Sequence, residues 1–429
     1  MSEGATNSAG SYLRDPLLVC AVIAVLFGMA AWIRLGIPSK PYFDEIHYIP
    51  AARALLEDGA YLNREHPMLG KQLIALGVAW LGDNPIGWRI ASHIAGMATL
   101  YASMRALWHT TQDRFATIAF GILLATGFHL FVHARIAMLD IFMATFLAVA
   151  AWHFAAAIRQ PENGRWRLAI TGIALGLALG SKWNAVPIAI LPGLMFFAAR
   201  LSAGRKHLIM SDRGIPVPGV SLMEAFIWLG LLPLTIYALT YLPGFSLTNS
   251  PLAANGLIGL HQEMIELQVS VKQPHPYQST WPQWLLNTRG IWYLYEFTDA
   301  AQRGVLLIGN PLTMLLGLPA LLWCLFRGVS QRNWGKLAIV IGFAVSLGLW
   351  LVANKPIQFY YHYFLPSIFL LAALAISISD LARTQYRWAS YAVLAGSIVF
   401  FAIFFKLLTA AALEGPMSFA KWTWIAGWR

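Results

Sequence analysis

The chain alternates between long apolar runs and shorter polar connections. Runs of roughly twenty apolar residues are long enough to cross the hydrocarbon core of a bilayer as α-helices. In hydrocarbon every backbone N–H and C=O must be paired internally, and unbroken runs favour helices over the alternating pattern of a β-barrel. We therefore predict about eleven transmembrane helices. They cover residues 16–36, 86–108, 115–133, 136–158, 167–182, 184–201, 222–243, 304–326, 335–353, 358–380 and 388–410.

Two longer segments, 37–85 and 244–303, interrupt this pattern. The first contains amphipathic stretches such as Ile49 to Leu56, which predict helices lying along the membrane surface. The second is rich in Trp and Tyr, which settle at headgroup depth. The chain has no internal repeat of the transporter type. We expect one all-α integral membrane domain over residues 1–429, with these segments as long loops that contain interfacial helices.

Composition supports a membrane location. Hydrophobic residues make up 58% of the chain and charged residues 11%, whereas a soluble domain carries about a quarter charged residues. The first apolar run, Pro16 to Trp32, is too long for a typical signal-peptide core, so we expect an uncleaved first span. Cys20 and Cys324 both lie inside apolar runs, which favours core or lipid-facing positions over a disulfide or a metal pair.

The distribution of positive charge predicts how the chain is oriented. The net charge is +11, but the basic residues are spread among the loops, so membrane topology explains them and no nucleic-acid partner is expected. Five short basic connections fall on one side in the eleven-span order, and the positive-inside rule makes that side cytoplasmic. Segments 37–85 and 244–303 are then outer loops. The basic residues of the five connections are Arg105 and Arg114; Arg159, Arg165 and Arg167; Arg200, Arg205, Lys206 and Arg213; Arg327, Arg332 and Lys336; and Arg383 and Arg387.

The adjacent acids Asp44 and Glu45 follow the first span closely, between Phe43 and Tyr48. Carboxylates between aromatic residues near lipid are costly unless polar or cationic groups meet them. One interpretation is a solvated loop pair. The other is a general base beside a carboxylate that positions a substrate. The dipeptide alone does not decide between them.

Further ionisable residues fall at the same outer boundary in this topology. Such residues at membrane depth are functional candidates because each is costly unless it is paired. Structurally, the cations could instead snorkel to the interface or pair with Asp140. As a set, cations facing carboxylates suit a phosphate leaving group and a hydroxyl nucleophile. The set comprises Arg64, Glu65, His66, Lys71, Arg89, Arg135, Asp140 and Lys182.

These segments resemble, in order, the signatures of the protein O-mannosyltransferase family. Phe43-Asp44-Glu45 followed by His66-Pro67-Met68-Leu69-Gly70-Lys71 resembles its opening signature, in which a second proline usually stands in place of Met68. The similarity continues over most of the chain. The further segments are Trp88-Arg89, Arg135 with Leu139-Asp140, Gly180-Ser181-Lys182-Trp183, His275-Pro276-Tyr277 with Trp281, Trp284, Arg289, Ile291-Trp292-Tyr293 and Glu296, Gly309-Asn310-Pro311, and Phe359-Tyr360-Tyr361 with Leu365-Pro366.

The resemblance implies a GT-C type membrane glycosyltransferase with its active site on the outer face. The family transfers mannose from polyprenyl-phosphate-mannose to Ser or Thr of exported proteins, with inversion. By that analogy Asp44 is the catalytic acid of the first outer loop and Glu45 is its neighbour. Eukaryotic members carry a soluble outer domain, for which segment 244–303 is too short. The family resemblance therefore supports the identity of the donor more directly than the identity of the acceptor.

In this mechanism we expect Asp44 to deprotonate the acceptor hydroxyl and Glu45 to orient the acceptor or contact sugar hydroxyls. Some of the available cations should stabilise the departing lipid phosphate, and position ranks Lys182 and Arg135 first among them. His66 has the alternative of a turn or capping role before Pro67. The candidate phosphate ligands are Arg135, Lys182, Arg89, Arg289 and Lys355. The residues expected to position the substrates are His66, Asp140, His275, Tyr277 and Glu296.

No DxD motif or His cluster calls for a metal, so we expect no metal or cofactor. The expected partners are a lipid-phosphate sugar, an exported polypeptide and membrane lipids. Lack of an endoplasmic-reticulum retention tail and of the outer domain favours a bacterial inner membrane, with the site facing the periplasm or exterior. Two alternatives stay open. In the first alternative, the acceptor is a glycan or a lipid, as in enzymes that modify lipid A. In the second, the chain is a secondary transporter or flippase, a class that usually shows matched repeats around a midplane site.

Overall fold

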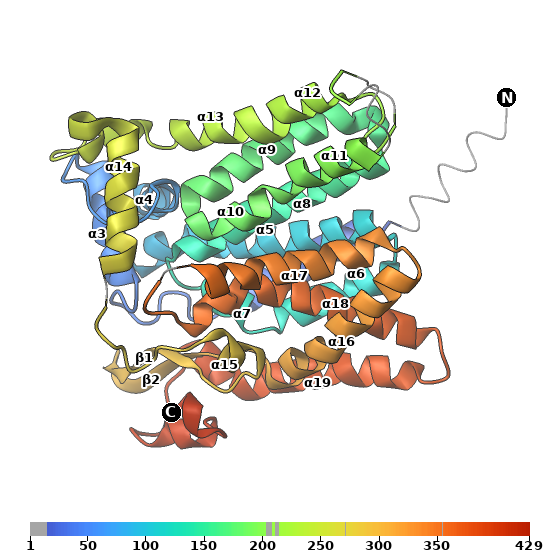
Figure 1. Ribbon diagram of the computed structural model, residues 1–429. Coiled ribbons are helices and arrows are strands. Elements are labelled where there is room, and N and C mark those ends of the chain that lie inside the picture. Colours follow the sequence, from blue (N-terminus) through green and yellow to red (C-terminus); the bar gives the residue numbers. More distant parts are fainter. Residues whose placement is uncertain (1–14, 203–207, 211–213, 271, 354) are drawn as a thin grey trace.

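The computed structural model describes residues 15–202, 208–210, 214–270, 272–353 and 355–429. Residues 1–14 of the expected domain, and Arg205, Lys206 and Arg213 of the basic connections, lie outside these ranges. Figure 1 shows a bundle of long helices that run side by side, with α3, α4, α14 and a two-stranded hairpin gathered at one end. The functional residues of the first outer loop therefore lie at an end of the bundle.

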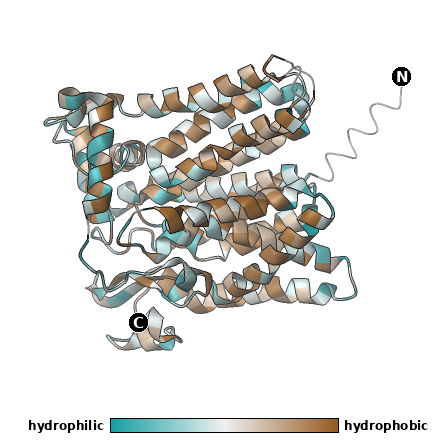
Figure 2. Ribbon diagram, viewed as in Figure 1, coloured by the Kyte–Doolittle hydropathy of each residue, from teal (hydrophilic) through white to brown (hydrophobic). Residues whose placement is uncertain are grey.

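Within the described ranges, seven helical segments are long and apolar enough to cross a membrane. Hydrophobic residues cover much of these helices, and hydrophilic ones gather at the bundle's ends (Figure 2). The protein is thus a helical integral membrane protein, as predicted. The segments are Leu139–Arg159 (α8), Trp183–Ser202 (α10 and α11), Leu222–Phe245 (α12 and α13), Pro311–Ser330 (α16), Trp334–Val352 (α17), Tyr360–Ala382 (with α18, Phe364–Ala382) and Arg387–Leu408 (α19).

The remaining four predicted spans also coincide with helices, which are shorter or less apolar. The run 115–133 is broken at Phe128, whose φ of 71° does not fit a right-handed helix. The exact number of spans therefore stays a prediction. These helices are α2 (Leu17–Trp32), α5 (Pro85–Thr111), α6 (Arg114–Ala125) with α7 (His129–His133), and α9 (Gly164–Ser181).

Two of the long segments are irregular. One consists of α10 (Val186–Ala189) followed by α11 (Leu191–Ser202). The other contains a π-helical turn, Ile227–Leu231, between α12 (Leu222–Phe226) and α13 (Leu232–Leu239). Pro233 lies two residues after this turn, and because proline lacks an N–H it disturbs the regular bonding there. Helix α9 packs closely on this region, where a side chain at Gly172 would collide with the Trp228 carbonyl.

Short helices lie at the outer end, as expected for both long loops. Loop 37–85 contains α3 (Glu45–Leu56) and α4 (Leu69–Leu81), and the second loop contains α14 (Pro251–Ser270) and α15 (Trp281–Leu285). Helix α14 runs across the ends of the long helices (Figure 1). It bends at Gly256, whose φ of 65° and ψ of −174° are readily adopted only by glycine.

The second loop also contains an antiparallel hairpin, which corrects the expectation of helices alone. Strands β1 (Ile291–Thr298) and β2 (Ala301–Leu307) pair from Ile291 with Leu307 to Thr298 with Ala301. The two turn residues, Asp299 and Ala300, have φ values of 48° and 57°, the geometry of a type I′ turn. Because 304–307 belong to β2, the predicted span 304–326 begins later, at Pro311.

Four of the five basic connections lie at the other end of the bundle. Figure 1 shows that the turns joining α5 to α6, α8 to α9, α16 to α17 and α18 to α19 are all at the end opposite α3, α14 and the hairpin. This arrangement agrees with the predicted alternation of the loops. It also places the candidate acids and these basic connections on opposite faces of the protein.

Candidate active site

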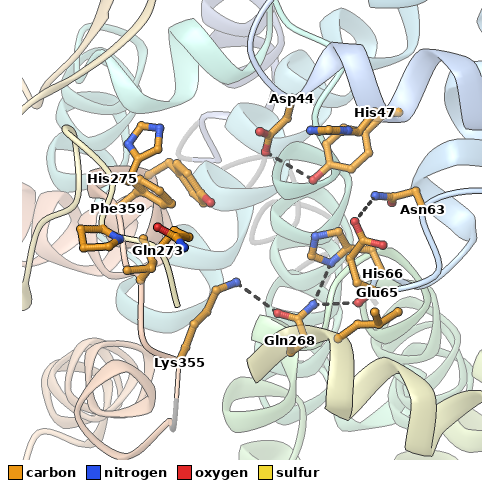
Figure 3. Close-up of a pocket in the computed structure, with 15 residues that line it drawn as sticks. Asp44, His47, Asn63, Glu65, His66, Gln268, Gln273, His275, Lys355 and Phe359 are labelled. Atoms are coloured by element: carbon orange, nitrogen blue, oxygen red, sulfur yellow. Dashed lines mark hydrogen bonds between the residues drawn. The ribbon is translucent and has the colours of Figure 1, made fainter. Parts of the chain in front are cut away.

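A polar cavity of about 350 Å³ opens between the outer helices. Its walls come from the start of α3, the loop before α4, the end of α14 and the chain before α18. Figure 3 shows Asp44, Lys355, His66 and His275 around the same space. The cavity is lined by Asp44, His47, Tyr48, Asn63, Glu65, His66, Leu267, Gln268, Gln273, Pro274, His275, Lys355, Ile357, Phe359 and Tyr361.

Asp44 is one of two acids that line this cavity, the other being Glu65. Asp44 immediately precedes α3, and its carboxylate accepts a hydrogen bond of 3.4 Å from the Tyr48 hydroxyl, one turn along the helix. Burial raises the pKa of the Asp44 carboxyl above its ordinary value, while the nearby Lys182 ammonium acts in the opposite direction. A carboxylate with a raised pKa is a better proton acceptor, as a general base requires.

Glu45 points away from the cavity and into the protein. Its carboxylate accepts hydrogen bonds from Arg89 Nε at 2.8 Å and Nη2 at 2.9 Å, and from the Ala137 N–H at 2.9 Å. Both side chains of the ion pair are 0% exposed. The expected contact between Glu45 and a substrate is therefore unsupported, because adjacent residues at the start of a helix point in different directions.

Arg89 and Arg135 also differ from their predicted role as phosphate ligands. Besides Glu45, Arg89 binds the carbonyls of three residues, Leu35, Pro38 and Lys40. Arg135 binds the carbonyls of Ala31, Ile33 and Arg34 near the end of α2. Both guanidinium groups are buried and engaged by main-chain oxygens. We therefore reassign both arginines to holding the first outer loop and the end of α2 in place.

Lys182 and Asp140 form a buried ion pair beside the cavity. Lys182 Nζ lies 2.7 Å from Asp140 Oδ2 and 5.3 Å from the centre of the Tyr361 ring. Lys182 follows α9, and Asp140 lies in the first turn of α8. Tyr361 also lines the cavity, so the pair lies close to the cavity wall. The sequence prediction that Asp44, Asp140 and Lys182 gather at one place agrees with this geometry.

Lys355 is the one lysine or arginine among the described residues that line the cavity. Its Nζ donates to Gln268 Oε1 at 3.1 Å, and Gln268 Nε2 contacts the Glu65 carbonyl at 2.7 Å and His66 Nδ1 at 3.3 Å (Figure 3). Burial, reinforced by Lys182, lowers the pKa of Lys355 to about 8. Burial, together with the positive charges of Lys182 and Lys355, holds the pKa of the His66 imidazole well below its ordinary value. His66 is therefore neutral at pH 7.

The other predicted positioning residues divide between the cavity and its surroundings. His275 lines the cavity and packs edge-on against Phe359 at 5.0 Å. Tyr277 is not among the lining residues. Glu296 pairs with Lys40 at 3.1 Å and is 41% exposed, and Arg289 donates to the Pro276 carbonyl. Tyr277, Glu296 and Arg289 therefore lie in the surrounding loops rather than in the cavity wall.

The sequence interpretation missed several groups of this site. Gln268 and Tyr48 contact candidate site residues directly. Lys71, one of the ionisable candidates but given no role in the mechanism, is 2% exposed, and its Nζ donates to the carbonyls of Asn63 at 2.6 Å and His66 at 2.9 Å. Tyr48 and Lys71 carried a signal: one lies a helical turn after Asp44, and the other is a lysine in an amphipathic helix. Gln268 lies far from the motifs, and only the fold brings it near.

No cluster of three His, Cys, Asp or Glu side chains suited to a metal ion occurs in the described part of the chain. The arrangement contains two carboxylates beside an open space, Asp44 and Glu65, with Lys355 among the lining residues and Lys182 next to the ring of Tyr361. A carboxylate can accept a proton and lysines can stabilise a developing phosphate charge.

Comparison with known proteins gives two family matches. Residues 21–249 match the family described as dolichyl-phosphate-mannose-protein mannosyltransferase. Residues 254–428 match the C-terminal four-transmembrane region of protein-O-mannosyltransferase. A relative, the polyprenol-phosphate-mannose–protein mannosyltransferase of Mycolicibacterium smegmatis, is 24% identical over 95% of this chain and 92% of its own length.

Solved structures share the fold. A chain of the Saccharomyces cerevisiae protein O-mannosyltransferase Pmt1–Pmt2 complex bound to the sugar donor superposes with a TM-score of 0.83 at 14% identity, over 96% of this chain and 92% of that one. ArnT from Cupriavidus metallidurans bound to undecaprenyl phosphate gives 0.53 at 15% identity, over 89% and 62%. With its two family matches spanning nearly the whole sequence, the chain belongs to the protein O-mannosyltransferase family of membrane glycosyltransferases.

Proposed function

We propose that this protein transfers mannose from a polyprenyl-phosphate donor to Ser or Thr hydroxyls of exported proteins, with inversion at the anomeric carbon. The observation that carries the proposal is Asp44, a half-buried carboxylate on the wall of a polar cavity that faces Lys355. The names of the M. smegmatis and S. cerevisiae relatives support this donor and a protein acceptor. We place the reaction at the outer face of a bacterial cytoplasmic membrane, without a metal.

The chemistry assigns a role to each side of the cavity. The acceptor oxygen forms a bond to the anomeric carbon as the bond from that carbon to the phosphate oxygen breaks. Asp44 takes the hydroxyl proton, and the lipid phosphate leaves with the bonding electron pair. Lys355, and Lys182 once it exchanges Asp140 for the phosphate, stabilise the developing charge. His66 and His275, both on the cavity wall, are placed to hold the sugar or the acceptor.

The experiment measures transfer of labelled mannose from polyprenyl-phosphate-mannose in membranes that contain the wild type or Asp44→Asn. We expect Asp44→Asn to insert normally and to lose at least about a hundredfold in turnover, the scale of a general base. Asp58→Asn is the matched control, because Asp58 is exposed in the same outer loop. Near-normal transfer by Asp44→Asn would remove Asp44 from the mechanism.

The same assay separates the remaining functions. Label in protease-sensitive material supports a protein acceptor, whereas label in lipid extracts or polysaccharide indicates the glycan or lipid acceptor. Label that crosses the membrane still attached to its lipid indicates a flippase. An excess of chelator should leave transfer unchanged, and a loss restored by a divalent ion would overturn the metal-free mechanism.

A further inference from the structure

The residue before Asp44 has an unusual backbone. Phe43 has a φ of 51°, in the left-handed region where a residue with a Cβ is disfavoured. Such conformations persist when the surrounding structure fixes them, and they gather at functional sites. Asp44 is the next residue in the chain. The backbone angles of Phe43 therefore set the orientation of Asp44 relative to the rest of the first outer loop.

The ring of Phe43 is held by the hairpin of the other outer loop. It stacks on Tyr293 with ring centres 3.9 Å apart and planes at 17°, and it meets Tyr361 edge-on at 6.0 Å. Tyr293 is 4% exposed. A stacked pair at this distance is among the closest ring contacts in the protein, and it joins residues that are remote in sequence.

Tyr293 occupies an irregular position in its strand. The pairing of β1 with β2 shifts between Trp292 and Leu294, so that Tyr293 has no partner opposite it. A β-bulge inserts an extra residue and re-aims its side chain, and bulges are frequent next to active sites. Here the bulge directs the Tyr293 ring toward Phe43.

Contacts with helices of the membrane domain also fix the position of Tyr293. His133 Nδ1 lies 2.7 Å from the His129 carbonyl, so this nitrogen carries the proton and Nε2 is left as an acceptor. The Tyr293 hydroxyl, 3.4 Å from Nε2, therefore donates to it. The His133 ring stacks on Phe364 at 4.4 Å. Tyr293 is thus held between the first outer loop and helices α7 and α18.

We propose that Tyr293 is a positioning residue for Asp44, acting through Phe43. This inference rests on the proposed function, because it assigns the hairpin the task of holding the base in its reactive direction. Misplacing a reacting group by about 1 Å costs on the order of a hundredfold in rate. The Tyr293 ring touches neither the cavity nor, in this mechanism, a substrate, so its loss should change turnover rather than donor binding.

The test compares Tyr293→Leu, Tyr293→Phe and Tyr295→Leu in the purified full chain, with labelled polyprenyl-phosphate-mannose and the acceptor fraction that the wild type labels. Tyr295 lies in the same strand, but its hydroxyl donates to Pro416 and its ring packs on Trp292. We expect Tyr293→Leu to lower kcat about 10–100-fold with an unchanged donor KM. We also expect the acid limb of its pH profile to shift, because Asp44 changes surroundings. Tyr293→Phe, which keeps the ring, should lose far less, and Tyr295→Leu should keep the wild-type profile.

A double-mutant cycle with Phe43→Leu distinguishes positioning from general packing. If the two rings act through one contact, the double variant loses no more than the worse single variant. Additive losses in kcat, or a Tyr293→Leu variant with a lower Tm but the wild-type kcat and pH profile, would overturn the inference. Near-normal transfer by Asp44→Asn would instead remove Asp44 as the base, and failure of the wild type to transfer mannose would overturn the proposed function. Loss in Asp44→Asn with no effect of Tyr293→Leu removes the positioning role alone.

Discussion

Lys182 and Asp140 lie 2.7 Å apart in a buried ion pair, beside the ring of Tyr361. An isolated charge in this position would be strongly disfavoured, so each residue supplies the counter-charge that the other requires. The pair also places the side chain of Lys182 close to the cavity wall. In the proposed mechanism, a lipid phosphate that enters the cavity competes with Asp140 for the Lys182 side chain.

Lys182→Gln should therefore impair use of the donor more than use of the acceptor. We expect donor kcat/KM to fall about 100-fold, the scale for removal of one charge-stabilising donor, with an unchanged acceptor KM. Lys336→Gln is the matched control, because it breaks another largely buried Lys–Asp pair, with Asp380, at the opposite end of the bundle. A variant in which only the acceptor KM changes would contradict the assignment of Lys182 to the leaving group.

Glu45→Gln tests the other buried ion pair. This substitution keeps the shape of the side chain but leaves Arg89 without its counter-charge, and breaking a buried pair typically costs about 3–5 kcal/mol. We expect a lower Tm in detergent and a reduced yield of folded protein, and we expect the molecules that do fold to retain substantial turnover. Glu414→Gln, which removes an exposed pair with Lys421, should leave Tm unchanged. If Glu45→Gln kept the wild-type Tm and lost all turnover, Glu45 would be a substrate ligand after all.

The pH dependence should have two limbs with different origins. The raised pKa of Asp44 means that the base is protonated, and activity lost, at a higher pH than an ordinary aspartate would give. On the alkaline side Lys355 loses its charge as pH rises through about 8, and with it the attraction for the phosphate. The profile of kcat/KM, which reports the free enzyme, should be bell-shaped.

Lys355→Arg separates these limbs. Arginine stays charged at high pH, so the alkaline limb should move upward while the acid limb stays in place. Lys40→Arg is the control, because Lys40 is an exposed lysine of the first outer loop that pairs with Glu296 outside the cavity. An alkaline limb that does not move in Lys355→Arg assigns that limb to another group.

The sequence predicted the membrane domain well, because length and hydrophobicity of a run are local properties that the bilayer reads directly. It also predicted that Asp44, Asp140 and Lys182 gather, since alternating spans bring every second connection to one face. The family resemblance singled out Asp44 as the base, but the residues alone did not show that Glu45 points away from the substrates. Adjacent acids have the same local context, and only the tertiary fold places Arg89 against one of them.

The hairpin was not predicted from the sequence, for a related reason. Its first strand, Ile291–Thr298, is rich in aromatic residues, which suit both a strand and the headgroup region of a membrane. Pairing with 301–307 decides between the two, and pairing is a non-local property. The same holds for Gln268, whose contacts with His66 and Lys355 join segments far apart in the chain.

Lys71 offers the last test, because it supports the cavity from outside. Its ammonium is buried and donates to the carbonyls of Asn63 and His66, the ends of the loop that carries Glu65. Burial lowers the pKa of Lys71 to about 7, so the donor is partly charged at neutral pH, and each of its hydrogen bonds contributes about 1 kcal/mol or more. Lys71→Met keeps most of the side-chain length but removes both bonds, so residues 61–68 should open more often.

Hydrogen exchange of the intact protein in detergent measures this opening. We expect the amides of 61–68 to exchange at least about tenfold faster in Lys71→Met, since a loss of 1.4 kcal/mol already gives that factor, and kcat to fall as His66 loses its place on the cavity wall. Lys421→Met, at an exposed lysine, should change neither. Unchanged exchange over 61–68 would mean that other contacts hold the loop, and that Lys71 is a buried cation with a different task.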